Sequence, residues 1–195
     1  KRFYNIDKER TYLYGSCAGG LDALLLSVRY PSYFAAVAVE GPEIHYTVCE
    51  NNQGHCEYPV DWIKKTNILN HLDNLLNTPI FIINSKNDKK TCYELCNAIV
   101  KNINDNSGYA IVDEVANPTK NKDISLMTEN YNMAKVFSFF EGRQKEMPSM
   151  INFSTYQLKY NTSDWLAIDK INIPKKALIK GSYKNNHIKI ESENI

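Results

Sequence analysis

The hydrophobic residues of the first 141 positions alternate between short unbroken runs and runs spaced three and four residues apart. Unbroken apolar runs are typical of parallel strands covered on both faces, and the wider spacing is typical of amphipathic helices. The predicted strands are 10–14, 34–39, 79–84 and 109–115, and the predicted helices are 18–30, 67–76, 91–104 and 130–141. This alternation predicts an α/β fold with a doubly wound parallel sheet.

The pattern changes after residues 142–150, which we predict to be a linker. Beyond it come four short runs typical of strands, at 151–156, 165–169, 177–181 and 187–191. Polar and apolar residues alternate clearly in the last of them, as in an antiparallel strand with one solvated face. We therefore predict a small antiparallel β appendage over 151–195 that contains a buried Trp165 and leaves an exposed sheet edge able to pair with another strand.

The most informative stretch is the junction between the first predicted strand and the first predicted helix. Gly15 and Gly19 flank Cys17 there, in the spacing Gly-x-Cys-x-Gly. Small residues let a strand and a helix meet closely, and a sharp turn at the central residue lifts its side chain above the sheet. Ser16 is one position out of register and is expected to point away. A glycine-rich turn without any catalytic role is the alternative.

Together with the following segment RYPSYFAA, this junction resembles the α/β-hydrolase superfamily. The resemblance is greatest to prolyl-oligopeptidase-like and polyhydroxybutyrate-depolymerase-like hydrolases, in which the pattern GxSxGG precedes such a segment. It implies that Cys17 occupies the nucleophile position, normally serine, and that the backbone N–H of Ala18 belongs to the oxyanion hole. Dienelactone hydrolases of the same superfamily use a cysteine nucleophile. Residues 1–141 would then be the C-terminal part of a hydrolase domain.

The resemblance also implies an acid and a histidine that follow the nucleophile in chain order. Asp88 comes after the strand 79–84 and falls at the acid position. The histidine belongs in the loop after the last strand, but residues 116–125 contain none. His45 and His55 lie in the long loop after the strand beside the turn, so they are the candidates for a substitute base.

The two remaining histidines are not candidates. His71 is expected at the surface of a helix, and His187 belongs to the appendage.

The missing histidine leaves two hypotheses for the function. A free cysteine has a pKa of about 8.5, so only a few per cent is thiolate at neutral pH. Acid–base assistance by a histidine is typically worth about 10²–10⁴ in rate. The first hypothesis is a degenerate, catalytically inactive hydrolase domain that serves as a binding or structural module. The second is an active thiol hydrolase of ester or peptide bonds with a rerouted base.

Composition and net charge limit the kinds of partner that we expect for this chain. The hydrophobic fraction of 43% allows a core, and the net charge of +1 gives no argument for nucleic acid or an anionic membrane. No apolar run is long enough for membrane insertion, and no cofactor motif is present. A hydrolase of this fold has several strands before the turn, so we expect a preceding segment or a protein partner to complete the sheet beside residues 10–14.

The spacing of the cysteines raises two questions: in which compartment the protein is located, and whether it binds a metal. Cys49 and Cys56 bracket a short polar loop, and a disulfide between them would indicate export. A metal site built from Cys49, His55, Cys56 and a helical cysteine is the alternative, but its spacing matches no zinc pattern. No metal is therefore predicted, and the location of the protein stays open.

Overall fold

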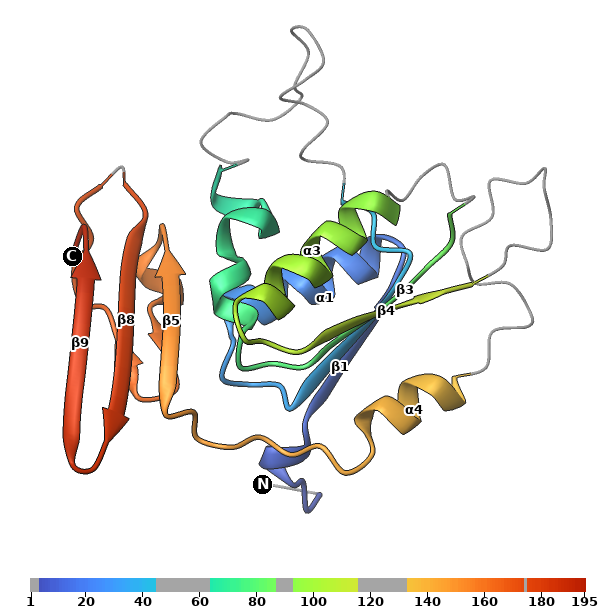
Figure 1. Cartoon of the computed structure of the whole chain (residues 1–195), viewed down its shortest axis with the longest axis horizontal. Helices are drawn as coiled ribbons and strands as arrows, with labels where there is room; N and C mark the ends of the chain where they lie inside the picture. Colours follow the sequence, from blue (N-terminus) through green and yellow to red (C-terminus); the bar gives the residue numbers. More distant parts are fainter. Residues whose placement is uncertain (1–3, 45–63, 87–92, 116–132, 174) are drawn as a thin grey trace, which may run out of the picture.

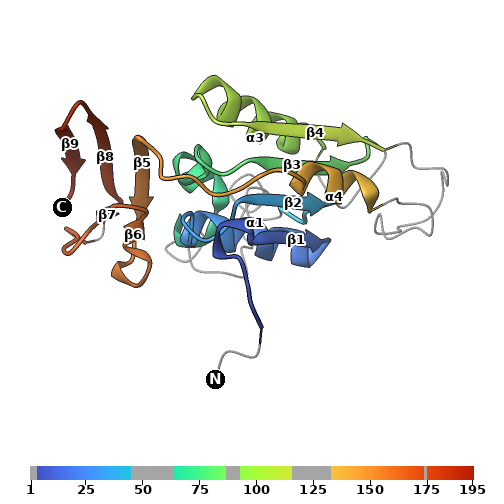
Figure 2. The ribbon, with the colours of Figure 1, turned by 90° about the horizontal axis from the view of Figure 1, so that it is seen from below.

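The computed structural model describes residues 4–44, 64–86, 93–115, 133–173 and 175–195. Four parallel strands form one sheet in the order β1-β2-β3-β4 (Figures 1 and 2). They are β1 (Tyr12–Ser16), β2 (Ala36–Glu40), β3 (Ile80–Asn84) and β4 (Ala110–Glu114). The predicted parallel sheet is therefore confirmed.

Helical segments cover both faces of this sheet. One face carries α1 (Ala18–Arg29), the 3-10 segment η2 (Ile68–Leu75) and α3 (Tyr93–Asp105), and the other carries α4 (Ala134–Phe140) (Figure 1). Val37 and Val39 belong to the core beneath α1, whereas Ala36 and Ala38 belong to the core beneath α4. Both sets of side chains on β2 are buried, which explains its unbroken apolar run.

The helix predicted over residues 67–76 is a 3-10 segment rather than an α-helix. Asn67 caps it by accepting a hydrogen bond from the backbone N–H of Leu69 at 3.0 Å. The backbone at His71 departs from helical geometry, with φ −133° and ψ 17°. The segment therefore consists of two short helical turns joined at a kink, and its apolar residues are divided between them. None of the helices in the described ranges is long and apolar enough to cross a membrane.

One edge of the parallel sheet is strand β1. Within the described part of the chain it pairs only with β2, from Tyr12 opposite Ala36 to Ser16 opposite Glu40. Figure 2 shows β1 and β4 at opposite margins of the sheet. The strand that leads to Cys17 is thus an edge strand within the described part of the chain.

The C-terminal strands form a separate antiparallel unit. Its three-stranded sheet has the order β5-β8-β9, with β5 (Met150–Thr155), β8 (Ala177–Lys184) and β9 (His187–Glu193). A two-stranded ribbon of β6 (Thr162–Ser163) and β7 (Leu166–Ala167) lies beside it. The predicted strand 165–169 is therefore shorter than expected. The unit has its own core, made of Ile151, Phe153, Leu166, Ile168, Ile171, Ala177 and Ile179.

A buried asparagine joins the two units. The Asn74 amide nitrogen donates to the carbonyl of Val28 at 2.7 Å and to the carbonyl of Ser154 at 3.0 Å. Its side-chain oxygen accepts from the backbone N–H of Ser154 at 2.8 Å. One side chain thus links the end of α1, the segment η2 and strand β5, and all these groups are buried.

Trp165, predicted to be buried, is half-buried against the appendage core. Its ring lies over Gly181, where an added Cβ would be 2.6 Å from the indole, and its Nε1 donates to the carbonyl of Pro148 at 2.8 Å. We expect Trp165→Ala to lower the free energy of unfolding by about 3 kcal/mol, the low end for an emptied aromatic site. Urea denaturation measures this. Trp165→Phe keeps the ring contact and should lose less; equal losses for both would contradict the packing role.

Candidate active site

The turn between β1 and α1 places Cys17 in a rare backbone conformation, with φ 56° and ψ −124°. A non-glycine residue at positive φ is uncommon and strained. Steric contact explains the neighbouring glycines. A Cβ on Gly15 would lie 2.0 Å from the carbonyl oxygen of Gly19, and one on Gly20 would lie 3.1 Å from the Cα of Pro42. Strand, helix and the segment after β2 therefore converge on Cys17.

Backbone hydrogen bonds hold this residue at the carboxyl end of the sheet. The Cys17 N–H donates to the carbonyl of Glu40 at 2.9 Å, and the Cys17 carbonyl accepts from the N–H of Gly20 at 3.0 Å. Ala18 is the first residue of α1, so its N–H is among the amides that a helix leaves without an internal partner. Such amides stabilise negative charge near a helix N-terminus.

Glu43 is the side chain that sequence reasoning missed. The Cys17 thiol donates to Glu43 Oε1, with 2.8 Å between sulfur and oxygen. Glu43 follows Gly41 and Pro42 directly after β2, and its backbone N–H also donates to the Cys17 carbonyl at 3.3 Å. A carboxylate placed just after a strand adjacent to the turn is a signal that was available in the sequence, because polar groups gather at the carboxyl edge of parallel strands.

A second carboxyl group is buried close by, at the end of β2. Glu40 is 3% exposed, and its Oε2 accepts from the Tyr14 hydroxyl at 2.7 Å. Burial raises the pKa of the Glu40 carboxyl, and the hydrogen bond from Tyr14 opposes that shift. Within the described residues Oε1 of Glu40 has no hydrogen-bond partner, a pattern that favours the neutral acid.

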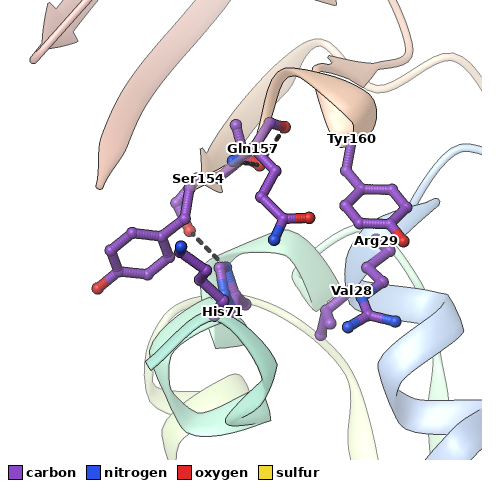
Figure 3. A pocket seen from close by; sticks show the side chains of 9 residues that line it. Val28, Arg29, His71, Ser154, Gln157 and Tyr160 are labelled. Atoms are coloured by element: carbon purple, nitrogen blue, oxygen red, sulfur yellow. Dashed lines mark hydrogen bonds between the residues drawn. The ribbon is translucent and has the colours of Figure 1, made fainter. Parts of the chain in front are cut away.

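His71 is not at the surface, contrary to the prediction. It is 7% exposed and lines a pocket between the two units, with Nδ1 3.5 Å from the Ser154 hydroxyl (Figure 3). Burial, together with the nearby charges of Lys176 and Arg29, lowers the pKa of its imidazole to about 4. The prediction fails because the appendage covers η2.

This pocket is far from the thiol. Val28 and Arg29 line it at the end of α1, whereas Cys17 precedes the start of that helix. A 12-residue α-helix is about 18 Å long. His71 therefore cannot serve Cys17 as a base. The fourth histidine, His187, is exposed on β9 in the appendage.

Several predicted site residues lie outside the described residues. They are Asp88, His45, His55, the loop 116–125 and the cysteines at 49, 56 and 92. In the described ranges no three His, Cys, Asp or Glu side chains cluster closely enough to hold a metal ion.

Comparisons with known proteins agree with this architecture. Residues 2–51 match a family model described as esterase PHB depolymerase. A Bacteroides ovatus protein described as a dipeptidyl aminopeptidase IV is similar in structure, with a TM-score of 0.56 and 22% identity over 70% of this chain and 20% of that chain. An acylaminoacyl peptidase from Pyrococcus horikoshii aligns with a TM-score of 0.49 and 15% identity, over 57% of this chain and 20% of that one.

The comparison with curated proteins finds no match. The chain spans about a fifth of the length of the two solved structures named above. The parallel sheet, its helices and the strand–turn–helix at Cys17 together define the class: the chain has part of the α/β-hydrolase fold. The predicted resemblance to prolyl-oligopeptidase-like and PHB-depolymerase-like hydrolases is confirmed.

Proposed function

We propose that this chain is a hydrolase-like binding module in which Cys17 occupies the nucleophile position but does not support useful turnover. In this proposal the β1–α1 turn is a nucleophile elbow, Ala18 contributes its N–H as the oxyanion donor, and Asp88 holds the acid position. The observation that carries the proposal is the 2.8 Å hydrogen bond from the Cys17 thiol to Glu43.

The chemistry of this pair supports a neutral thiol. Free thiols have a pKa of about 8.5 and free Glu carboxyls about 4.3. Because these pKa values differ by about four units, the pair with the proton on sulfur is favoured over the pair with the proton on oxygen by about 10⁴. A carboxylate beside the sulfur also repels the thiolate, which is the nucleophilic form. Glu43 therefore opposes the activation that a histidine would supply.

The second candidate is a thiol hydrolase in which Glu43 accepts the Cys17 proton. Two observations favour it: the strained backbone of Cys17 is retained, and the thiol already has a carboxylate in contact. Strain of this kind clusters at active sites. In this alternative, binding of substrate would have to shift the proton from sulfur to the carboxylate. The cleft would then take an ester or a peptide, with His45 or His55 as a further substitute base.

Alkylation and esterase assays on one set of variants separate the two candidates. We expect Glu43→Gln to raise the rate of iodoacetamide alkylation at Cys17 by about tenfold, since the repelling charge is gone while the side-chain shape is kept. Peptide mass mapping assigns the alkylated cysteine. Glu141→Gln, which removes an exposed carboxylate on another element, is the matched control and should leave the rate unchanged.

The same variants are then tested with p-nitrophenyl acetate and a peptide panel. The proposal expects no turnover above that of Cys17→Ala, either in the unmodified protein or in Glu43→Gln. Turnover that is lost in both Cys17→Ala and Glu43→Gln would overturn it in favour of the thiol hydrolase. In that case His45→Ala and His55→Ala would show whether a histidine assists.

A further inference from the structure

Within the described residues, the outer strand of the appendage, β9, pairs with β8 on one side and with no strand on the other. Strand β9 follows β8 in the order β5-β8-β9, and all seven of its residues are exposed. Ile188 and Ile190 are 68% and 54% exposed. Figure 1 shows β9 at the outer margin of the molecule, with no described element beyond it. A long edge strand with exposed isoleucines is a template for pairing with another strand.

The hairpin geometry determines which backbone groups are available on this edge. Asn185 and Asn186, with φ 50° and 62°, form a two-residue loop, and Lys184 lies opposite His187 as the closing pair. The closing pair of such a hairpin is hydrogen-bonded, and bonded positions then alternate along an antiparallel ladder. The N–H and C=O groups of Ile188, Ile190 and Ser192 consequently face away from β8.

The order of side chains along β9 is self-complementary in one antiparallel register. We propose that β9 pairs with β9 of a second copy of this chain about a two-fold axis at Ile190, joining the two appendage sheets into one. In this register Lys189 lies opposite the partner's Glu191, and His187 lies opposite the partner's Glu193. On the other face, Ile190 meets its own counterpart and Ile188 meets Ser192. Each outward backbone group then faces an outward group of the second copy.

Neighbouring registers lack this complementarity. Sliding one strand by two residues places either Lys189 opposite Lys189 or Glu191 opposite Glu191, and like charges directly opposite each other are destabilising. Sliding by one residue brings inward-facing backbone groups opposite outward ones and mixes the isoleucine face with the charged face. The two-fold at Ile190 is therefore the register that satisfies both backbone and side chains.

Charges within the chain extend the same pattern. Lys180 of β8 lies opposite Glu191, and the Lys189 amine is 2.6 Å from Glu191 Oε1 on the same strand. In the proposed dimer each Glu191 would lie between Lys180 of its own chain and the partner's Lys189. Alternating signs across neighbouring strands stabilise a sheet.

Charge reversal tests this register directly. Lys189→Glu gives two Glu–Glu pairs in the dimer and Glu191→Lys gives two Lys–Lys pairs, so each variant alone should dimerise at least about tenfold more weakly (1.4 kcal/mol). An equal mixture of the two restores both opposite-charge pairs across the interface and should recover a heterodimer. Lys184→Glu makes the same change on β8, away from the partner strand, and should leave the dimer intact. Sedimentation velocity across a concentration series measures all four samples.

Circular dichroism and thermal melting confirm that each variant is folded. A wild-type chain that stays monomeric up to about 1 mM, the limit of a very weak association, would overturn the proposal. A dimer that survives both single reversals, or a mixture that does not recover association, would overturn it as well. Recovery in the mixture alone supports pairing at β9 in the stated register.

Discussion

Gly15→Ala should destabilise the protein by more than about 3 kcal/mol, enough to remove most of the soluble folded chain. The added Cβ would lie 2.0 Å from the carbonyl oxygen and 2.6 Å from the carbonyl carbon of Gly19. Both atoms belong to the backbone of α1, so no side-chain rotation relieves the clash. Strand and helix would have to separate beneath Cys17. The measurement is urea denaturation followed by circular dichroism, together with the soluble yield.

Gly19→Ala is the matched control for this substitution. A Cβ at Gly19 would meet no atom within 4 Å, and the residue lies inside α1. Alanine is favoured over glycine in a helix by about 0.8–1.0 kcal/mol, so this variant should be as stable as the wild type or slightly more so. If the free energies of unfolding of both alanine variants lie within about 1 kcal/mol of the wild-type value, the close approach of β1 and α1 is not a rigid constraint.

Acid should destabilise the fold through His71. The unfolded chain binds a proton at this residue near pH 6.5, whereas the folded chain, with the pKa of His71 lowered to about 4, cannot do so until lower pH. The free energy of unfolding is therefore unaffected by His71 above pH 6.5, and it decreases as the pH falls toward 4. A difference of this size corresponds to about 3 kcal/mol, since one pKa unit is 1.36 kcal/mol.

The check is the free energy of unfolding measured between pH 7 and pH 4 in wild type and in His71→Gln. Glutamine keeps a polar group near Ser154 but has no proton to take up, so the variant should start less stable and lose less on acidification. His187→Gln removes an exposed histidine and should follow the wild-type profile. Equal pH slopes for wild type and His71→Gln would show that His71 is protonated in the folded state without cost.

Prediction from sequence succeeded where local pattern and steric constraint act together. Unbroken apolar runs identified β2 and β3 because both faces of these strands are covered, and the glycines around Cys17 identified the turn because strand and helix meet there within van der Waals contact. The four short runs after position 150 identified the appendage, although β7 proved to be only two residues long.

Prediction failed where contacts come from distant parts of the chain. Periodicity indicated an α-helix over 67–76, but the segment kinks at His71, and Asn74 beyond the kink is bonded to both α1 and β5. The same packing buries His71, since Ser154 of β5 lies 83 residues further along the chain and no local pattern of η2 anticipates it. Glu43 was missed because it lies on a different strand end from Cys17, 26 residues away in sequence.

The sequence by itself determined the alternation of strands and helices, the sharp turn at Cys17 and the missing histidine in residues 116–125, because each depends on neighbours within a few positions. Only the tertiary structure decided which groups surround the thiol and which histidine is buried. Those outcomes depend on the order of strands in the sheet and on where the appendage docks. The partner of Cys17 is thus a carboxylate from the adjacent strand end, set by the parallel pairing of β1 with β2.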